Sequence, residues 1–413
     1  MQAFNKICVV GLGYIGLPTA AVFADQGVEI IGVDVNETVV SKVNQGVPHF
    51  GEPNLDAVLR RVVENGKLSA ATAPQPADAF LVAVPTPFAA GHKADLSYID
   101  AAAREIAPVL EKGNLVILES TSPVGTTEWM AKIMAELRPD LTFPQQKGEL
   151  SDIRVAHCPE RVLPGKILEE VVNNARVIGG MTRKCAQQAV SLYKIVVQGE
   201  CLATTVRTAE MAKLSENAFR DINIAFANEL AVICESLEIN PWEMIKLANL
   251  HPRVNILNPG PGVGGHCIAV DPWFIVDSAP DHATLIRTAR DRNDGMPEYV
   301  ADKVAKRAAE LVNPVIACLG LAYKADVDDL RESPAVEVVK HLADKKAGDI
   351  LVVEPHVSSL PPVLAERGLE LEDFDIAVGR ANLVVLLVDH QAFSYVDRNL
   401  LKDKFVIDTR GSW

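Results

Sequence analysis

The sequence lacks the excess of positive charge that a nucleic-acid-binding or membrane-surface protein would carry. Its 40 Lys and Arg residues stand against 54 Asp and Glu, a formal net charge of −14. This balance argues against nucleic acid or an anionic membrane as the main partner. Anionic small ligands stay open, because local cations and helix N-termini bind phosphate whatever the total charge.

Cysteines are few and have no informative spacing. There are seven, an odd number, and no pair of spacings resembles a disulfide framework or a zinc ligand set. We therefore expect a reducing compartment and no metal site. Cys8 and Cys318 lie in apolar runs that read as strands, where buried thiols are expected.

Long hydrophobic runs are also scarce. The uncharged stretch from Ile7 to Ala24 follows Lys6 and could pass for the apolar region of a signal peptide, but three glycines and Pro18 interrupt it. No second hydrophobic span follows, so we expect a cytoplasmic protein without membrane anchorage. With 413 residues, 48% of them hydrophobic, the chain is long enough for two or three domains.

What is present begins with a glycine pattern near the N-terminus. A strand predicted over 6–10 ends at Gly11, and Gly13 and Gly16 follow before a helix predicted over 18–26. A second strand is predicted over 29–33 and ends at Asp34, 18 residues beyond the last glycine. This strand–GxGxxG–helix–strand–acid order is typical of a dinucleotide-binding βαβ unit. The acid favours NAD over NADP, because it would repel a 2′-phosphate.

Two further predicted strands end in proline or small polar residues. They cover 79–84, followed by Pro85-Thr86-Pro87, and 115–118, followed by Glu119-Ser120-Thr121. Ligands bind at the carboxyl edge of a parallel sheet, so these ends are candidate site residues. The alternative is ordinary turn chemistry, which also favours Ser, Thr and Pro.

A long helix and a second α/β block follow. Apolar residues recur every three or four positions from Thr205 to Leu237 without a Gly or Pro, which predicts a helix of about 45 Å that links domains and forms dimers. From Pro314 onward, apolar strands alternate with helical segments. These strands are predicted over 315–320, 350–353, 383–388 and 405–407.

The most reactive candidate is Cys267, in the glycine-dense segment Gly260-Pro-Gly-Val-Gly-Gly-His-Cys-Ile-Ala-Val-Asp271. Glycines leave backbone N–H groups bare and let a substrate approach. If a helix begins at the cysteine, its dipole would favour the thiolate, which makes Cys267 a candidate nucleophile. The alternative is a small packed thiol.

Lys213 and Asn217 are four residues apart on the predicted long helix and therefore share a face. Lys213 could stabilise an oxyanion and Asn217 could orient a hydroxyl or a water, provided that this face meets the Cys267 segment. The other polar residues on or near the face are Glu210, Arg220 and Asp221. The alternative interpretation is that all five form the solvated side of the helix.

Three cations lie in predicted loops: Arg253, Lys324 and Arg331. Isolated cations are mostly surface charge. In an acidic protein, three in loops could instead form the phosphate clamp that a nucleotide-linked substrate requires.

Together these motifs resemble the UDP-glucose/GDP-mannose dehydrogenase family over essentially the whole chain. The segments 159–165, 249–255 and 260–272 are similar to those of its N-acetylhexosamine branch, from bacterial surface-polysaccharide pathways. The resemblance implies an α/β fold with three domains. They are an NAD-binding Rossmann domain (1–200), a central long-helix dimerisation domain (201–300) and a C-terminal Rossmann-like nucleotide-sugar domain (301–413).

The resemblance also implies a four-electron oxidation at C6 of a UDP-N-acetylhexosamine, with two NAD and a Cys267 thiohemiacetal and thioester. UDP-N-acetyl-D-mannosamine is the expected substrate, and UDP-GlcNAc or another UDP-hexose is the alternative. The catalytic roles would fall on Cys267, Lys213, Asn217, Asp271, Thr121 and Glu160. The NAD site would comprise Gly11, Gly13, Tyr14, Ile15, Gly16, Asp34, Thr86 and Thr127. Substrate would contact Lys213 and Asn217 as well as Arg161, Val162, Arg220, His251, Arg253, Gly264, Tyr323, Lys324 and Arg331. A homodimer with shared active sites is implied, with His251 and Arg253 reaching into the neighbouring subunit.

One position departs from the pattern of UDP-glucose enzymes. Pro164 stands where they carry a second glutamate, four residues after Glu160, which argues against UDP-glucose as substrate. Two other classes stay open: a catalytically silent nucleotide-sugar-binding regulator, and a two-electron 3-hydroxyacid-type dehydrogenase. The latter gives no purpose to Cys267 or the second α/β block.

Overall fold

The computed structural model describes residues 4–163 and 165–413, so Pro164, on which the UDP-glucose comparison depends, lies outside the described residues. The chain divides into two compact units, one ending at Ser215 and one spanning Glu216–Trp413. The break falls inside one long helix, α9 (Val206–Ser236). The expected domain boundaries at 200 and 300 therefore stay predictions.

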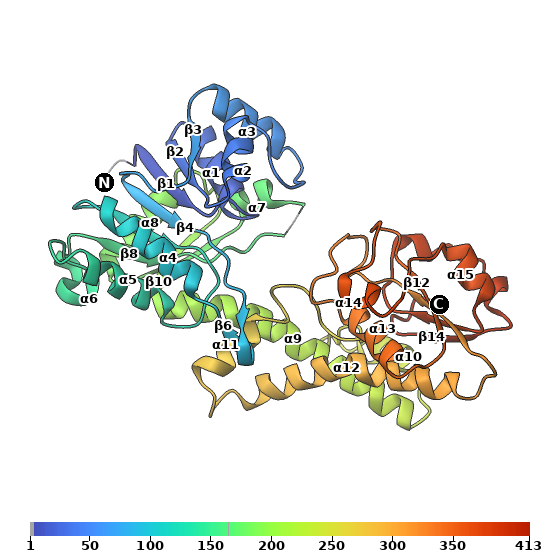
Figure 1. Cartoon of the computed structure of the whole chain (residues 1–413). Helices are drawn as coiled ribbons and strands as arrows, with labels where there is room; N and C mark the ends of the chain where they lie inside the picture. Colours follow the sequence, from blue (N-terminus) through green and yellow to red (C-terminus); the bar gives the residue numbers. More distant parts are fainter. Residues whose placement is uncertain (1–3, 164) are drawn as a thin grey trace. The chain divides into compact units, whose positions relative to one another are not determined.

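The N-terminal unit is built on an eight-stranded sheet with the order β10-β9-β8-β7-β4-β1-β2-β3 (Figure 1). All neighbours are parallel except β8 and β9, which are antiparallel. Its strands are β1 (Lys6–Val10), β2 (Glu29–Val33), β3 (Leu68–Ala71), β4 (Ala79–Val82), β7 (Leu115–Leu118), β8 (Arg154–His157), β9 (Arg176–Gly180) and β10 (Cys201–Thr205), with a separate hairpin of β5 (Phe88–Ala89) and β6 (Lys93–Ala94).

Helices cover both faces of this sheet. Alternate residues of β1 point to opposite faces: Ile7 and Val9 join one buried apolar cluster, and Cys8 and Val10 join another. The burial of Cys8 is confirmed. The helices are α1 (Gly16–Asp25), α2 (Glu37–Asn44), α3 (Leu55–Glu64), α4 (Ser97–Ile106), α5 (Thr126–Leu137), α6 (Pro144–Lys147), α7 (Ile167–Asn173) and α8 (Arg183–Tyr193).

The C-terminal unit joins a helical region to a smaller sheet. The sheet is fully parallel, with the order β12-β11-β13-β14, and Cys318 on β11 is buried as expected. The strands are β11 (Val315–Leu319), β12 (Asp349–Val353), β13 (Leu383–Leu386) and β14 (Phe405–Asp408). The helices after α9 are α10 (Pro241–Ala248), α11 (Asp271–Ser278), α12 (Thr284–Ala308), α13 (Pro334–Asp344), α14 (Pro362–Ala365) and α15 (Phe374–Arg380).

The predicted elements are confirmed, with small shifts at their ends. The strand predicted over 79–84 ends at Val82, before Pro85, and the one predicted over 383–388 ends at Leu386. At the latter end, the N–H groups of Leu387 and Val388 both donate to the Leu319 carbonyl, which takes the chain out of the ladder. Among the described residues, no helix is long and apolar enough to cross a membrane.

Candidate functional site

The glycine pattern forms a tight loop between β1 and α1, at the point where the strand order reverses. Gly11 has φ of 93°, and a Cβ there would lie 2.5 Å from the Ala83 carbonyl oxygen. A Cβ on Gly16 would overlap the Gly11 carbonyl oxygen, so neither position admits a side chain. The half-buried Asp34 accepts the Leu12 N–H at 3.1 Å, which places its carboxylate beside the glycine loop. These residues fit a dinucleotide whose ribose hydroxyls meet an acid.

The other expected NAD-site residues lie in two different environments. Next to Gly13, Tyr14 is 51% exposed and packs on Phe50 with ring centroids 4.3 Å apart; Ile15, at the start of α1, is half-buried. Thr86 donates from its hydroxyl to the Thr121 carbonyl at 2.6 Å, which joins the ends of β4 and β7.

Thr127 is fully buried, and its partner is Glu210 on α9. Glu210 accepts the Thr127 hydroxyl at 2.6 Å, the Thr127 N–H at 2.9 Å and the Gly125 N–H at 2.7 Å. Its carboxylate therefore caps the N-terminus of α5. Burial raises the pKa of Glu210, and the hydrogen bonds to Gly125 and Thr127 oppose that rise. The interpretation of Glu210 as part of a solvated helix face is wrong.

Glu160 belongs to a buried polar cluster, made of Glu119, Glu160, Arg176 and Tyr193. One Glu160 oxygen pairs with Arg176 at 2.5 Å, and the other accepts the Arg161 N–H at 2.6 Å. The Tyr193 hydroxyl donates to Glu119 at 2.5 Å.

Glu119 is the unusual member of this cluster. Burial, reinforced by the neighbouring Glu160 charge, raises its pKa from 4.5 to about 7, while the bond from Tyr193 opposes the rise. A protonated Glu119 leaves the cluster with one anion, Glu160, and one cation, Arg176. The sequence placed Glu119 at a candidate strand end, but nothing local indicated that it is buried or that it joins Glu160, Arg176 and Tyr193.

Close packing within the C-terminal unit explains why the Cys267 segment contains glycines. A Cβ on Gly264 would overlap the Glu332 carbonyl oxygen and lie 3.0 Å from the Tyr323 Cβ. Gly265 has φ of 83°, and a Cβ there would be 2.9 Å from the Tyr323 ring. The glycines thus seat the segment against the loop that carries Tyr323, in addition to any access they give a substrate.

Cys267 is exposed, and it lies in a turn rather than at the start of a helix. The helix, α11, begins at Asp271, whose N–H donates to the Cys267 carbonyl at 2.9 Å. The condition for the dipole argument, a helix that begins at the cysteine, is therefore not met. The effect of a helix dipole falls off within the first turn, so α11, which begins four residues after Cys267, favours the thiolate less than a helix beginning at the cysteine would.

Asn217 and Asp271 lie together as expected. The Asn217 amide donates to the Asp271 carboxylate at 2.5 Å, and Asp271 is 3% exposed. Lys213 is half-buried, one turn before Asn217 on α9. It belongs to the N-terminal unit, with Thr121 and Glu160, whereas Cys267, Asn217 and Asp271 belong to the C-terminal unit.

Arg220 is exposed on α9, but its neighbour Asp221 is fully buried. Asp221 pairs with the buried Arg290 of α12 at 2.5 Å and accepts the Asn293 amide at 2.8 Å. Placing Asp221 on a solvated face is therefore wrong; it joins two helices. The 3-residue spacing of Arg290 and Asn293 on α12 is the only sequence signal of this contact, since it puts both on one face.

The remaining expected substrate residues are mostly exposed. His251 and Arg253 are exposed, and the Arg253 N–H donates to the His251 ring at 3.3 Å. Lys324 is exposed, with its ammonium 5.6 Å from the Tyr323 ring centroid. Arg331 is exposed and paired with Asp329 at 2.8 Å. In the N-terminal unit, Arg161 and Val162 are half-buried beside Glu160.

Family models match all of this architecture. The UDP-glucose/GDP-mannose dehydrogenase family matches through its NAD binding domain at residues 5–197, its central domain at 207–295 and its UDP binding domain at 317–413.

Individual relatives agree. NDP-N-acetyl-D-galactosaminuronic acid dehydrogenase of Ralstonia nicotianae is 60% identical over 410 residues, covering 99% of this chain and 96% of its own. UDP-N-acetyl-D-mannosamine dehydrogenase of Campylobacter jejuni is 58% identical over 395 residues, covering 95% and 97%. The solved UDP-D-ManNAc dehydrogenase of Pyrococcus horikoshii superposes with a TM-score of 0.87 at 39% identity, covering 99% and 96%.

The glycine loop with its acid, the two Rossmann-like sheets and full-length similarity above 30% agree with one another, and the resemblance expected from the sequence is confirmed. The chain belongs to the UDP-glucose/GDP-mannose dehydrogenase family, and it is an NAD-dependent dehydrogenase of UDP-sugars.

Proposed function

We propose that this enzyme oxidises C6 of UDP-N-acetyl-D-mannosamine to the carboxylate in two NAD-dependent steps joined by a covalent bond to Cys267. The observation that carries the proposal is an exposed cysteine in a glycine-seated turn, one turn before the Asp271–Asn217 pair. Relatives of this chain at 58% and 56% identity bear the name UDP-N-acetyl-D-mannosamine dehydrogenase.

NAD, when bound, accepts one hydride in each oxidation. The chain supplies the rest. Lys213 acts on the C6 oxygen as acid/base or oxyanion stabiliser, and the C6 alcohol becomes an aldehyde. The Cys267 thiolate then adds to the aldehyde carbon, because an aldehyde gives up a hydride readily only after a nucleophile adds. The resulting thiohemiacetal loses the second hydride and becomes a thioester.

Hydrolysis then releases the uronate and returns the thiol. Asp271 and Asn217 are assigned to the reacting oxygen and the water; the hydrogen bond between them supports this assignment, because it fixes both side chains. Thr121 and Glu160 are proposed as further water-positioning groups. Glu160 is suited to hold a fixed position because both of its oxygens are engaged, by Arg176 and by the Arg161 N–H.

Binding of the nucleotide sugar is assigned to Arg161, Val162, Arg220, His251, Arg253, Gly264, Tyr323, Lys324 and Arg331, in addition to Lys213 and Asn217. The NAD site is assigned to the glycine loop with Tyr14, Ile15 and Asp34, and to Thr86 and Thr127. Thr127 would contribute through its position at the start of α5, because Glu210 occupies its hydroxyl.

We also propose a homodimer formed through α9. Phe219, Phe226 and Ile233 recur every seven residues along this helix and are 71%, 52% and 44% exposed. A seven-residue spacing places them on one stripe, and an exposed apolar stripe on a long helix favours association with a second helix. His251 and Arg253 would then reach the neighbouring subunit's site. A cytoplasmic location and a role in bacterial surface-polysaccharide synthesis complete the proposal.

One observation favours a second substrate. The Ralstonia relative, at 60% identity, is named for an N-acetyl-D-galactosaminuronic acid product. The test is a panel of UDP-ManNAc, UDP-GalNAc, UDP-GlcNAc and UDP-glucose, with NADH absorbance as readout. We expect the highest kcat/KM with UDP-ManNAc. A clear preference for UDP-GalNAc or UDP-GlcNAc would overturn the substrate assignment and leave the mechanism standing. No turnover of any sugar would favour the regulatory alternative.

A further inference from the structure

Three loops meet at the carboxyl edge of the small parallel sheet. The loop after β11 carries Tyr323 and Lys324, Glu354 follows β12, and His390 lies beyond β13. Since β11 lies between β12 and β13, this edge is where the strand order reverses, the usual ligand-binding position of such sheets. Neither Glu354 nor His390 has a role in the proposed mechanism.

Glu354 holds the backbone of the β11 loop. One of its oxygens accepts the N–H groups of Leu321 at 2.6 Å and Ala322 at 3.0 Å, and the His390 Nε2 lies 3.0 Å away. Its other oxygen accepts the His356 N–H at 3.0 Å. The side chain is fully buried. Burial would raise the pKa of Glu354, but the donors from His390, Leu321 and His356 outweigh it and lower the pKa, so the group is a fully engaged carboxylate.

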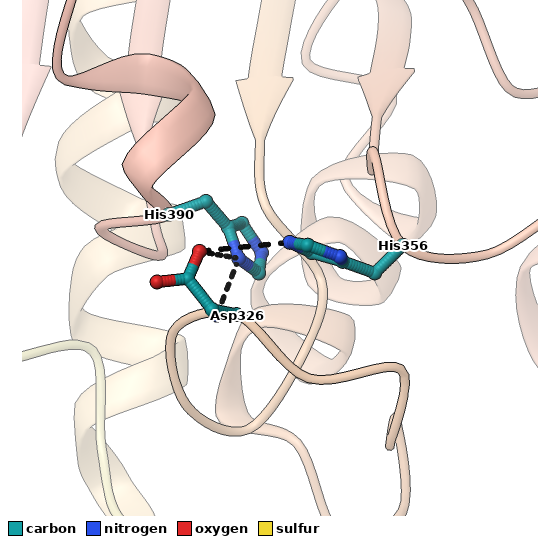
Figure 2. A group of neighbouring side chains, drawn as sticks. All are labelled: Asp326, His356 and His390. Carbon is teal, nitrogen blue, oxygen red and sulfur yellow. Dashed lines mark hydrogen bonds and ion pairs between the residues drawn. The ribbon is translucent and has the colours of Figure 1, made fainter.

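His390 continues this chain of hydrogen bonds to the far side of the same loop. The Asp326 N–H donates to His390 Nδ1 at 2.9 Å, as Figure 2 shows. Nδ1 therefore carries the lone pair, and Nε2 carries the proton that it donates to Glu354. Tyr323 and Lys324 lie between Ala322 and Asp326. Glu354 and His390 therefore hydrogen-bond to the backbone on both sides of these two residues.

His356 completes a group that resembles a metal site. Donor atoms of Asp326, His356 and His390 lie within 4.8 Å of one another. However, the His390 Nδ1 lone pair is already used by the Asp326 N–H, and its Nε2 faces Glu354. A cation could bind His390 only if the hydrogen bond of its ring with the Asp326 N–H or with Glu354 were broken. The geometry therefore favours a loop anchor over a metal centre.

The N-terminal unit has a similar arrangement, in which the acid is less buried and accepts fewer hydrogen bonds. The Gly11 N–H donates to the Val33 carbonyl at 2.8 Å, and the Gly320 N–H donates to the Val353 carbonyl, also at 2.8 Å. Asp34 directly follows β2, which ends at Val33, and Glu354 directly follows β12, which ends at Val353. The half-buried Asp34 receives one N–H from its glycine loop, whereas Glu354 is buried and receives two, plus His390.

We propose that Glu354 and His390 are positioning residues for the nucleotide sugar: they fix the Leu321–Asp326 loop so that Tyr323 and Lys324 meet the UDP group. This rests on the proposed assignment of Tyr323 and Lys324 to substrate. Glu354 thus occupies the position that corresponds to Asp34 in the N-terminal unit, but it anchors a loop, whereas Asp34 can accept a ribose hydroxyl.

The test measures UDP affinity by calorimetry with the full-length enzyme. We expect Glu354→Gln to weaken UDP binding about tenfold or more, because an amide has one acceptor oxygen for the contacts now made by two, and misplacement of a positioned group by about 1 Å costs affinity on this scale. The KM for the UDP-sugar should rise in parallel, while kcat and the KM for NAD stay within about threefold. His390→Gln, which keeps a donor and an acceptor, should cost less.

Two comparisons separate the outcomes. If Glu354 acts through the loop, adding Glu354→Gln to Lys324→Ala should weaken UDP binding by less than the product of the single effects. Full additivity, or unchanged UDP affinity in Glu354→Gln, would overturn the proposal. His356→Gln is the matched control: near wild-type UDP affinity supports the anchor, whereas a loss equal to that of His390→Gln points to a metal centre instead. If Lys324→Ala alone leaves UDP binding unchanged, the substrate assignment of Lys324 fails, and the additivity test is then made with Tyr323→Ala in its place.

Discussion

The raised pKa of Glu119 predicts how the stability of the folded protein changes with pH. The pKa of Glu119 is raised from 4.5 to about 7 by burial and by Glu160. In the folded protein the group therefore holds a proton over a pH range in which the unfolded chain has lost it. Stability must fall as pH rises through that window. A pKa difference of this size corresponds to about 3 kcal/mol in total, of which somewhat less than half, about 1–2 kcal/mol, is lost between about pH 6 and about pH 8.5.

The perturbation is Glu119→Gln, which keeps an oxygen for the Tyr193 hydroxyl but cannot ionise. Its absolute stability depends on how the new amide packs, but its pH dependence does not. We expect the free energy of unfolding of the variant to fall between about pH 6 and about pH 8.5 by about 1–2 kcal/mol less than that of the wild type.

The assay is urea unfolding followed by circular dichroism, analysed for the transition that NAD shifts, because NAD stabilises the unit that binds it. Glu105→Gln, at an exposed position on α4, is the control and should keep the wild-type pH dependence. If Glu119→Gln and the wild type lose stability in parallel over this range, the buried, proton-holding Glu119 is refuted.

Three further predictions concern other parts of the chain. Asp221→Ala removes the buried carboxylate that pairs with Arg290, which then keeps, among the described residues, only Asp294, a carboxylate that is 44% exposed, and should lower the free energy of urea unfolding by about 3–5 kcal/mol. Glu229→Ala, which breaks an exposed pair with Arg292, should change it by less than about 1 kcal/mol. An equal effect of the two would contradict this reasoning. If the proposed dimer forms through the α9 stripe, Phe219→Glu combined with Phe226→Glu should give a monomer in light scattering where the wild type gives a dimer, and a dimer of the double variant would exclude this stripe as the interface. Asp34→Ala should raise the KM for NAD about tenfold without changing UDP affinity, since a charge-assisted hydrogen bond to ribose contributes about 1.5–3 kcal/mol; an unchanged KM would exclude Asp34 from the cofactor site.

The parts of the fold that could be predicted from sequence are those encoded locally. The glycine loop and Asp34 lie within one βαβ unit, and apolar runs closed by turns predicted β1, β2, β4, β7 and the four strands of the smaller sheet. The strands β3, β8, β9 and β10 and the short hairpin were not predicted. These signals depend on residues a few positions apart, so they survive without knowledge of the tertiary structure. Only strand ends shifted, where the chain leaves the ladder toward a loop.

The polar residues of α9 show what could not be predicted. Glu210 and Asp221 look like any solvated helix face, yet both are buried. Their partners, Thr127 and Arg290, are 83 and 69 residues away in the chain, and nothing local marks them. Long-range pairing of this kind decides whether a charge is solvent-exposed or structural.

The Cys267 segment shows a partial success. Its glycines pointed to a special backbone, but the reason found in the structure includes packing against Tyr323 and Glu332, which no local pattern encodes. Nor did the sequence show whether a helix begins at Cys267; it begins four residues later, at Asp271. A glycine run specifies that the backbone is unusual without specifying which neighbour requires it.

The central claim is that Cys267 carries the second oxidation, and NADH stoichiometry tests it most directly. With limiting UDP-ManNAc and excess NAD, the wild type should form two NADH per sugar and release the uronate. Cys267→Ser should form at most one NADH per sugar and no uronate, because no thiolate is present to add to the aldehyde. Two NADH per sugar from Cys267→Ser would contradict the covalent mechanism.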